Sequence, residues 1–155
     1  MVEVRFKLNG KPVAVDVKPN EILLDVLRYK LGVKSVKRGC ERAECGVCTV
    51  LLDGLPVYSC TVLAVQVEGR EVTTVEGLSG DPVAKVLVNS LIRVGGIQCG
   101  FCAPGLVLTA YALLKRRARP SRDEIAKAIE GNLCRCTGYR KVIDAVAEAA
   151  SQLSD

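Results

Sequence analysis

The chain has 155 residues, of which 49% are hydrophobic and 25% are charged, and its formal net charge is +5. This composition fits a globular protein with one ordinary domain or two small ones, and it excludes a disordered chain. The complete absence of histidine excludes Rieske clusters, histidine-containing zinc sites and Ser-His-Asp triads. The positive charges are mostly scattered and only four Tyr and two Phe are available for base stacking, so nucleic acid is not expected as a partner.

The first half of the chain predicts two β-hairpins around one helix. Alternating or turn-bounded strands are expected at residues 2–8, 13–17, 47–52, 55–60 and 71–75. Asn9-Gly10 is a strong signal for the first hairpin turn, and Asp53-Gly54 predicts the second. A helix is predicted over about 21–31, with Asn20 as its N-cap and Gly32 as its end. We therefore expect a small α+β domain that ends near residue 76.

The second half predicts four helices with short links. They are expected from Pro82 to Gly95-Gly96, at 104–116, from Ser121 to Glu130 and at 138–152. Asp81 precedes a proline suited to a first helical turn, and Ser121 with Glu124 forms a capping box. Turn-forming residues gather near 76–81, so we predict one domain at 1–77 and a helical domain at 78–155.

Eight cysteines are the most distinctive residues of the chain. No signal peptide or transmembrane stretch is expected, which predicts a cytoplasmic protein without direct membrane insertion. Thiols stay reduced in that compartment, so the cysteines favour metal binding over disulfides. Disulfides stay open as an alternative, because intracellular proteins of hyperthermophiles do form them.

The first four cysteines have the spacing C-x4-C-x2-C followed by one distant cysteine, which is typical of plant-type 2Fe–2S ferredoxins. They are Cys40, Cys45, Cys48 and Cys60. Glycines at 39 and 46 allow the loop to bend tightly, so that backbone N–H groups can approach a cluster. We expect these four thiolates to bind one cluster, with buried free cysteines as the alternative.

The other four cysteines form two short pairs, each placed before a predicted helix. They are Cys99, Cys102, Cys134 and Cys136. Two helix N-termini would favour an anionic cluster between them, and the C-x-C pair suits two ligands on one iron. A four-thiolate zinc site is the alternative that spacing alone leaves open.

Three motifs in the same order resemble those of the xanthine oxidase family of molybdenum hydroxylases. These are the loop Lys37–Val50, the segment Ile97–Gly105 with its QCGFC-x-PG pattern, and the segment Gly131–Tyr139, which is similar to GNxCRCTGY. Together with the length of 155 residues, they resemble the separate small iron–sulfur subunit of that family. The resemblance favours a second 2Fe–2S cluster over zinc.

The resemblance implies an N-terminal β-grasp (plant-type ferredoxin-like) domain followed by a C-terminal four-helix bundle, each with one 2Fe–2S cluster. It implies a large partner subunit that binds molybdenum through a pterin and a medium subunit that binds FAD, assembled as a dimer of heterotrimers. Electrons would pass from the molybdenum centre to the cluster of the helical domain, then to the plant-type cluster and on to FAD. The chain would be the electron-transfer subunit of an oxidoreductase, with no catalytic residue or substrate site of its own.

Two further residues are implied by the motifs. Gln98 matches a glutamine that approaches the pterin, and Cys136 matches the cluster ligand nearest to it. One departure concerns Ala43, where the family usually has glycine; a positive φ there would cost alanine about 1 kcal/mol. A free-standing ferredoxin and a structural zinc protein are the alternative functions.

Overall fold

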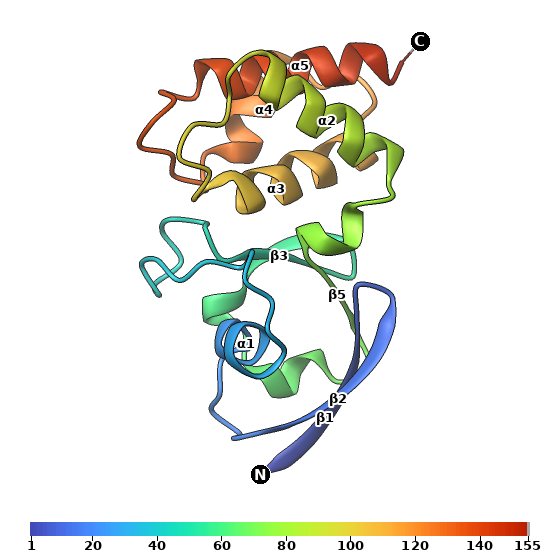
Figure 1. Cartoon of the computed structure of the whole chain (residues 1–155), viewed down its shortest axis with the longest axis vertical. Helices are drawn as coiled ribbons and strands as arrows, with labels where there is room; N and C mark the ends of the chain where they lie inside the picture. Colours follow the sequence, from blue (N-terminus) through green and yellow to red (C-terminus); the bar gives the residue numbers. More distant parts are fainter. Residues whose placement is uncertain (155) are drawn as a thin grey trace.

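A mixed five-stranded sheet occupies the first half of the chain and helices occupy the second in the computed structural model, which describes residues 1–154 (Figure 1). The strands are β1 (Val2–Leu8), β2 (Lys11–Val17), β3 (Thr49–Leu52), β4 (Leu55–Tyr58) and β5 (Glu71–Thr73). Their order in the sheet is β2-β1-β5-β3-β4. β1 pairs antiparallel with β2 and parallel with β5, and β3 is antiparallel to both its neighbours. Both predicted hairpins are confirmed.

The helix predicted at 21–31 is shorter and of a different kind. A short α-helix, α1 (Leu23–Asp25), continues as a π-helical turn, η1 (Val26–Lys30). Asn20 is not its N-cap, because Ile22 is held in an extended conformation by a β-bridge to Leu63. The helix can therefore begin only after Ile22, and a tertiary contact overrides the local capping signal.

The second hairpin is also shorter than its sequence pattern predicts. β4 ends at Tyr58, and Cys60 lies in a 3-10 turn, η2 (Ser59–Thr61), instead of on the strand. The hydroxyl of Ser59 donates to the carbonyl oxygen of Cys48 at 2.7 Å, and the Ser59 N–H donates to the same oxygen at 3.3 Å. These bonds turn the chain back toward Cys48. Two more 3-10 segments follow, η3 (Ala64–Val67) and η4 (Val75–Leu78).

Four longer helices make up the second half. They are α2 (Pro82–Arg93), α3 (Ala103–Arg116), α4 (Arg122–Ile129) and α5 (Arg140–Gln152). Both predicted caps are confirmed: the Asp81 carboxylate accepts from two N–H groups of α2, and Ser121 and Glu124 bond reciprocally at the start of α4. α5 begins two residues later than predicted, because Tyr139 has a φ of 67° and cannot belong to a right-handed helix.

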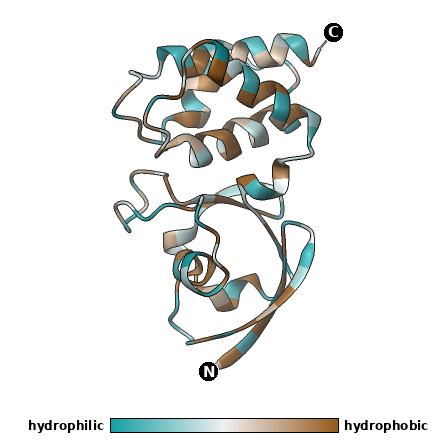
Figure 2. Cartoon of the chain, in the orientation of Figure 1, coloured by the Kyte–Doolittle hydropathy of each residue, from teal (hydrophilic) through white to brown (hydrophobic). Residues whose placement is uncertain are grey.

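Each half has its own apolar core, and a third cluster joins them. The joining cluster consists of Leu51, Leu78, Ala84, Leu108 and Ala112. Its members come from β3, η4, α2 and α3, so α3 packs over β3 at the boundary between the halves (Figure 1). Figure 2 shows apolar stripes on the inward sides of the helices. No helix within residues 1–154 is long and apolar enough to span a membrane.

Candidate functional site

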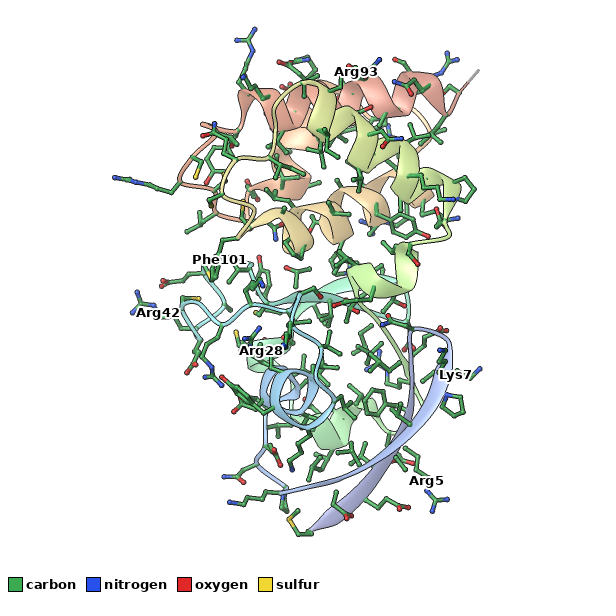
Figure 3. The ribbon with its side chains drawn as sticks, in the orientation of Figure 1. Arg5, Lys7, Arg28, Arg42, Arg93 and Phe101 are labelled. Carbon is green, nitrogen blue, oxygen red and sulfur yellow. The ribbon has the colours of Figure 1, made fainter. Side chains whose placement is uncertain are left out.

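Seven of the eight cysteines lie in loops outside any helix or strand, and Cys60 lies in the 3-10 turn η2. None of the eight forms a disulfide, so all remain available as thiolate ligands. Figure 3 places Arg42, between Cys40 and Cys45, and Phe101, between Cys99 and Cys102, on the same side of the molecule, and both side chains are exposed.

Backbone N–H groups surround the thiol of Cys40. The N–H groups of Arg42, Glu44 and Cys45 donate to its Sγ at 3.5, 3.3 and 3.3 Å. These hydrogen bonds, that of Arg42 foremost, lower the pKa of Cys40 to about 6. The Cys40 N–H in turn donates to Cys45 Sγ at 3.4 Å. The loop therefore stabilises thiolates, as a metal-binding loop requires.

Left-handed residues give this loop its curvature. Glu41, Ala43 and Gly46 have φ values of 56°, 61° and 69°. Ala43 therefore does have the positive φ that strains an alanine. A Cβ on Gly39 would lie only 2.7 Å from the Sγ of Cys45. The absence of a side chain at position 39 therefore lets this sulfur approach the backbone closely.

The thiols of Cys48 and Cys60 form a second, buried pair below the loop. Burial, together with the neighbouring Cys60 thiol, raises the pKa of Cys48 to about 11. Tyr58 lies within the electrostatic reach of all four thiols: burial first, and then Cys48, Cys45, Cys40 and Cys60, raise its pKa. The structure thus brings together the four cysteines of the first set, as predicted, in the pairs 40/45 and 48/60.

The four cysteines of the second set line one small cavity together with Gln98, Thr137 and their neighbours. They are Cys99, Cys102, Cys134 and Cys136. Burial and the nearby thiol of Cys134 raise the pKa of Cys102 to about 12. The pKa of Cys134 is lowered instead. Burial alone would raise it, but the Thr137 hydroxyl donates to Cys134 Sγ at 3.1 Å and outweighs burial together with the other hydrogen bonds to this sulfur.

The thiol contact in this set differs from the one expected. The thiol of Cys134 neighbours that of Cys102, whereas the C-x-C spacing suggested Cys134 and Cys136 as two ligands on one iron, so the sharing of ligands between the irons stays a prediction. Only one helix N-terminus adjoins the site as predicted: α3 begins directly after Cys102, whereas Arg140 starts α5 four residues beyond Cys136. The intervening left-handed residues Gly138 and Tyr139 separate that helix from the thiols.

Gln98 and Cys136, the two residues that the motifs place toward a pterin, are neighbours in the structure. The Gln98 side-chain N–H donates to the Cys136 carbonyl oxygen at 3.3 Å, and both residues are exposed. Cys99 is exposed as well, whereas Cys102 and Cys134 are partly buried. The second set therefore presents one edge to the surface.

The donor set fits two-iron clusters. Within residues 1–154, no three Cys, Asp or Glu side chains are gathered to hold a single metal ion. In the first set the thiol of Cys40 neighbours that of Cys45 and the thiol of Cys48 neighbours that of Cys60, and in the second set the thiol of Cys102 neighbours that of Cys134. Thr137 and Tyr58 were not predicted as members of these sites. Thr137 stands in the GNLCRCTGY motif, whereas nothing in the sequence marks Tyr58.

Two family models match the chain. One, described as a 2Fe-2S iron-sulfur cluster binding domain, matches residues 6–79, and the other, described as a 2Fe-2S binding domain, matches residues 74–147. Together they cover both cysteine sets.

Curated relatives and solved structures agree with these matches. The chain is 42% identical over 154 residues to the nicotinate dehydrogenase small FeS subunit of Eubacterium barkeri, covering 99% of this chain and 98% of the relative. It is 39% identical to the xanthine dehydrogenase iron-sulfur-binding subunit of Escherichia coli O157:H7, covering 95% and 93%. The structure of quinoline 2-oxidoreductase from Pseudomonas putida 86 superposes with a TM-score of 0.91 at 43% identity, covering 99% of this chain and 96% of that chain. The chain also matches the aldehyde oxidoreductase of Desulfovibrio desulfuricans (TM-score 0.92, 40% identity), of which it covers 17%.

Proposed function

The chain belongs to the family of small 2Fe–2S subunits of xanthine-oxidase-type molybdenum hydroxylases, and we propose that its two cysteine sets are the ligands of two clusters in an electron-transfer path. The observation that carries this proposal is the gathering of the eight cysteines into two groups of four: the first lies in a loop whose N–H groups donate to the Cys40 sulfur, and the second lines one small cavity. When bound, each cluster supplies one-electron chemistry; the chain supplies the thiolates and their surroundings.

In the first set, we propose that Cys40 and Cys45 ligate one iron and that Cys48 and Cys60 ligate the other. The N–H groups around Cys40 stabilise its negative charge and would keep it a thiolate at neutral pH. The buried pair is shielded from water, which protects it from oxidation.

In the second set, we propose Cys102 and Cys134 as ligands of one iron, and Cys99 and Cys136 as ligands of the other. Thr137 holds the Cys134 sulfur in position through its hydroxyl. Cys136 and Gln98 would lie nearest to the pterin of the large subunit, because they form the exposed edge of this set. Electrons would then enter at the second set and leave through the first toward FAD in the medium subunit.

We propose the architecture that this path needs. Residues 1–77 would form a plant-type ferredoxin-like β-grasp domain and residues 78–155 a four-helix 2Fe–2S domain, a division supported by the two separate cores and by η4 between them. The partners would be a molybdenum-binding large subunit and an FAD-binding medium subunit in a dimer of heterotrimers. A cytoplasmic location suits eight free thiols.

Metal analysis and spectroscopy of the purified chain test the cluster proposal. We expect iron and acid-labile sulfide in equal amounts and two distinct electron paramagnetic resonance (EPR) signals after reduction. Cys45→Ser should abolish one signal and Cys102→Ser the other. A colourless protein that contains zinc, or one whose two EPR signals both survive either substitution, would refute it.

The place in the electron path is tested in the assembled complex. Cys136→Ser should slow reduction of the flavin by substrate while the first cluster keeps its EPR signal. Flavin reduction at the unchanged rate would refute the entry point. Elution of the native chain alone near 16.6 kDa, without molybdenum or flavin subunits, would instead indicate a free-standing ferredoxin.

A further inference from the structure

A short segment of the second half is bound directly to the first cysteine loop. Three consecutive residues take part. The Gly131 carbonyl oxygen accepts from the Tyr58 hydroxyl at 3.1 Å, and the Leu133 N–H donates to the Cys45 carbonyl oxygen at 2.8 Å. Between them lies Asn132.

Asn132 is the centre of this junction. Its side chain is buried, with the whole residue only 3% exposed. The side-chain amide donates to the Gly46 carbonyl oxygen at 3.0 Å and to the Thr49 hydroxyl at 3.2 Å, and that hydroxyl donates to Gly46 as well, at 2.6 Å. A buried amide with two partners in the other half of the chain is costly to remove, because the groups it satisfies would lose their partner.

The two halves of the chain also lie too close together at this junction for Gly46 or Gly105 to carry a side chain. A Cβ on Gly105, at the start of α3, would lie 2.5 Å from the Gly46 carbonyl oxygen, and a Cβ on Gly46 would lie 2.7 Å from the Asn132 amide nitrogen. Hydrogen bonds and close packing therefore fix the same contact, which leaves little freedom for the two halves to shift.

The junction lies next to a cysteine of each set in the sequence. Gly46 directly follows Cys45, and Asn132 stands two residues before Cys134. A movement of Asn132 relative to Gly46 would therefore change the separation of the two sets. Electron transfer between redox centres falls steeply with distance, so this separation bears directly on function.

We propose that Asn132 is a positioning residue that fixes the distance and orientation between the two clusters. The proposal rests on the ligand sets proposed above. Tyr58 supports the same junction through Gly131, and the ring of Tyr58 packs on the core of the sheet half. Neither residue is assigned as a cluster ligand, so both can be changed while all eight cysteines remain.

Spin–spin coupling between the two reduced clusters tests the proposal in the full chain. This splitting of the EPR signals depends on the inverse cube of the separation, whereas a general loss of stability does not change it. Asn132→Ala should retain iron, sulfide and both EPR signals but lose much of the splitting. Asn89→Ala, which makes the same change at an exposed site on α2, should keep the splitting of the unchanged chain.

Several outcomes would overturn the proposal. It is wrong if Asn132→Ala keeps both signals with unchanged splitting, or if the unchanged chain shows two signals without splitting. Should Asn132→Ala fail to take up both clusters, Tyr58→Phe decides, because it removes one hydroxyl and keeps the ring: reduced splitting supports the proposal and unchanged splitting refutes it. An unchanged chain without 2Fe–2S signals would instead refute the ligand sets.

Discussion

Replacing Ala43 with glycine should stabilise the protein, although the change removes a methyl group. Ala43 has a φ of 61°, which costs a non-glycine residue about 1–2 kcal/mol. Glycine at position 43 would remove that strain. Its greater conformational entropy in the unfolded state would, however, destabilise the folded state by about 0.4–1 kcal/mol. The difference is a net stabilisation of about 1 kcal/mol, or a rise in Tm of about 2–4 °C for a chain of this size.

Thermal unfolding of the cluster-loaded chain, followed by circular dichroism, measures this effect. The matched control is Ala14→Gly, on the exposed side of β2, where φ is not positive and glycine should destabilise by about 0.5–1 kcal/mol. The two substitutions should therefore shift Tm in opposite directions. A decrease for Ala43→Gly as large as that of Ala14→Gly would refute the strain argument.

Three further substitutions test other parts of the structure. Ser121→Ala removes the hydroxyl oxygen that accepts from the Glu124 N–H in the capping box of α4, while the backbone N–H of residue 121 still donates to the Glu124 carboxylate, and the change should cost about 1 kcal/mol in urea unfolding. Thr137→Val removes the hydroxyl that donates to Cys134 Sγ, so the reduction potential of the second cluster should fall in an EPR redox titration. Gly39→Ala would place a Cβ 2.7 Å from Cys45 Sγ, so the iron content should fall by half.

Each of these predictions has a control or a contradictory result. Gly80→Ala, where a Cβ meets no atom within 4 Å and φ is not positive, should leave the iron content unchanged. An equal shift in the potentials of both clusters would contradict the role of Thr137. An unchanged urea midpoint for Ser121→Ala would show that the cap contributes nothing to the folded state.

Local sequence signals predicted those elements whose conformation is decided locally. The hairpin at Asn9-Gly10 and the caps of α2 and α4 depend on neighbours within a few residues, and all three are confirmed. The helix at 21–31 was wrong because Ile22 pairs with Leu63, a contact across 41 residues that no local pattern reveals. The start of α5 was wrong because Tyr139 adopts a left-handed conformation that tyrosine rarely takes.

The candidate sites show the same division. Motif spacing was sufficient to predict which four cysteines gather in each set, because three of the first four lie within one short loop. The contact of Cys102 with Cys134 was not predictable, since it depends on how two loops 31 residues apart pack. The bonds of Asn132 to Gly46 and Thr49 join opposite halves of the chain and could be found only in the structure.

The hydrogen bond from the Tyr111 hydroxyl to the Asp81 carboxylate, at 2.9 Å, should make stability depend on alkaline pH. It joins α3 to the cap of α2, and burial followed by the nearby Asp81 raises the pKa of Tyr111 from 10.0 to about 12. A raised pKa contributes stability that is fully present below pH 10 and is lost as the pH rises toward 12. Tyr111→Phe should therefore cost about 1–2 kcal/mol at pH 7, and this gap from the unchanged chain should narrow in urea unfolding between pH 10 and 12. A gap that stays constant up to pH 12 would refute the linkage between Tyr111 and Asp81.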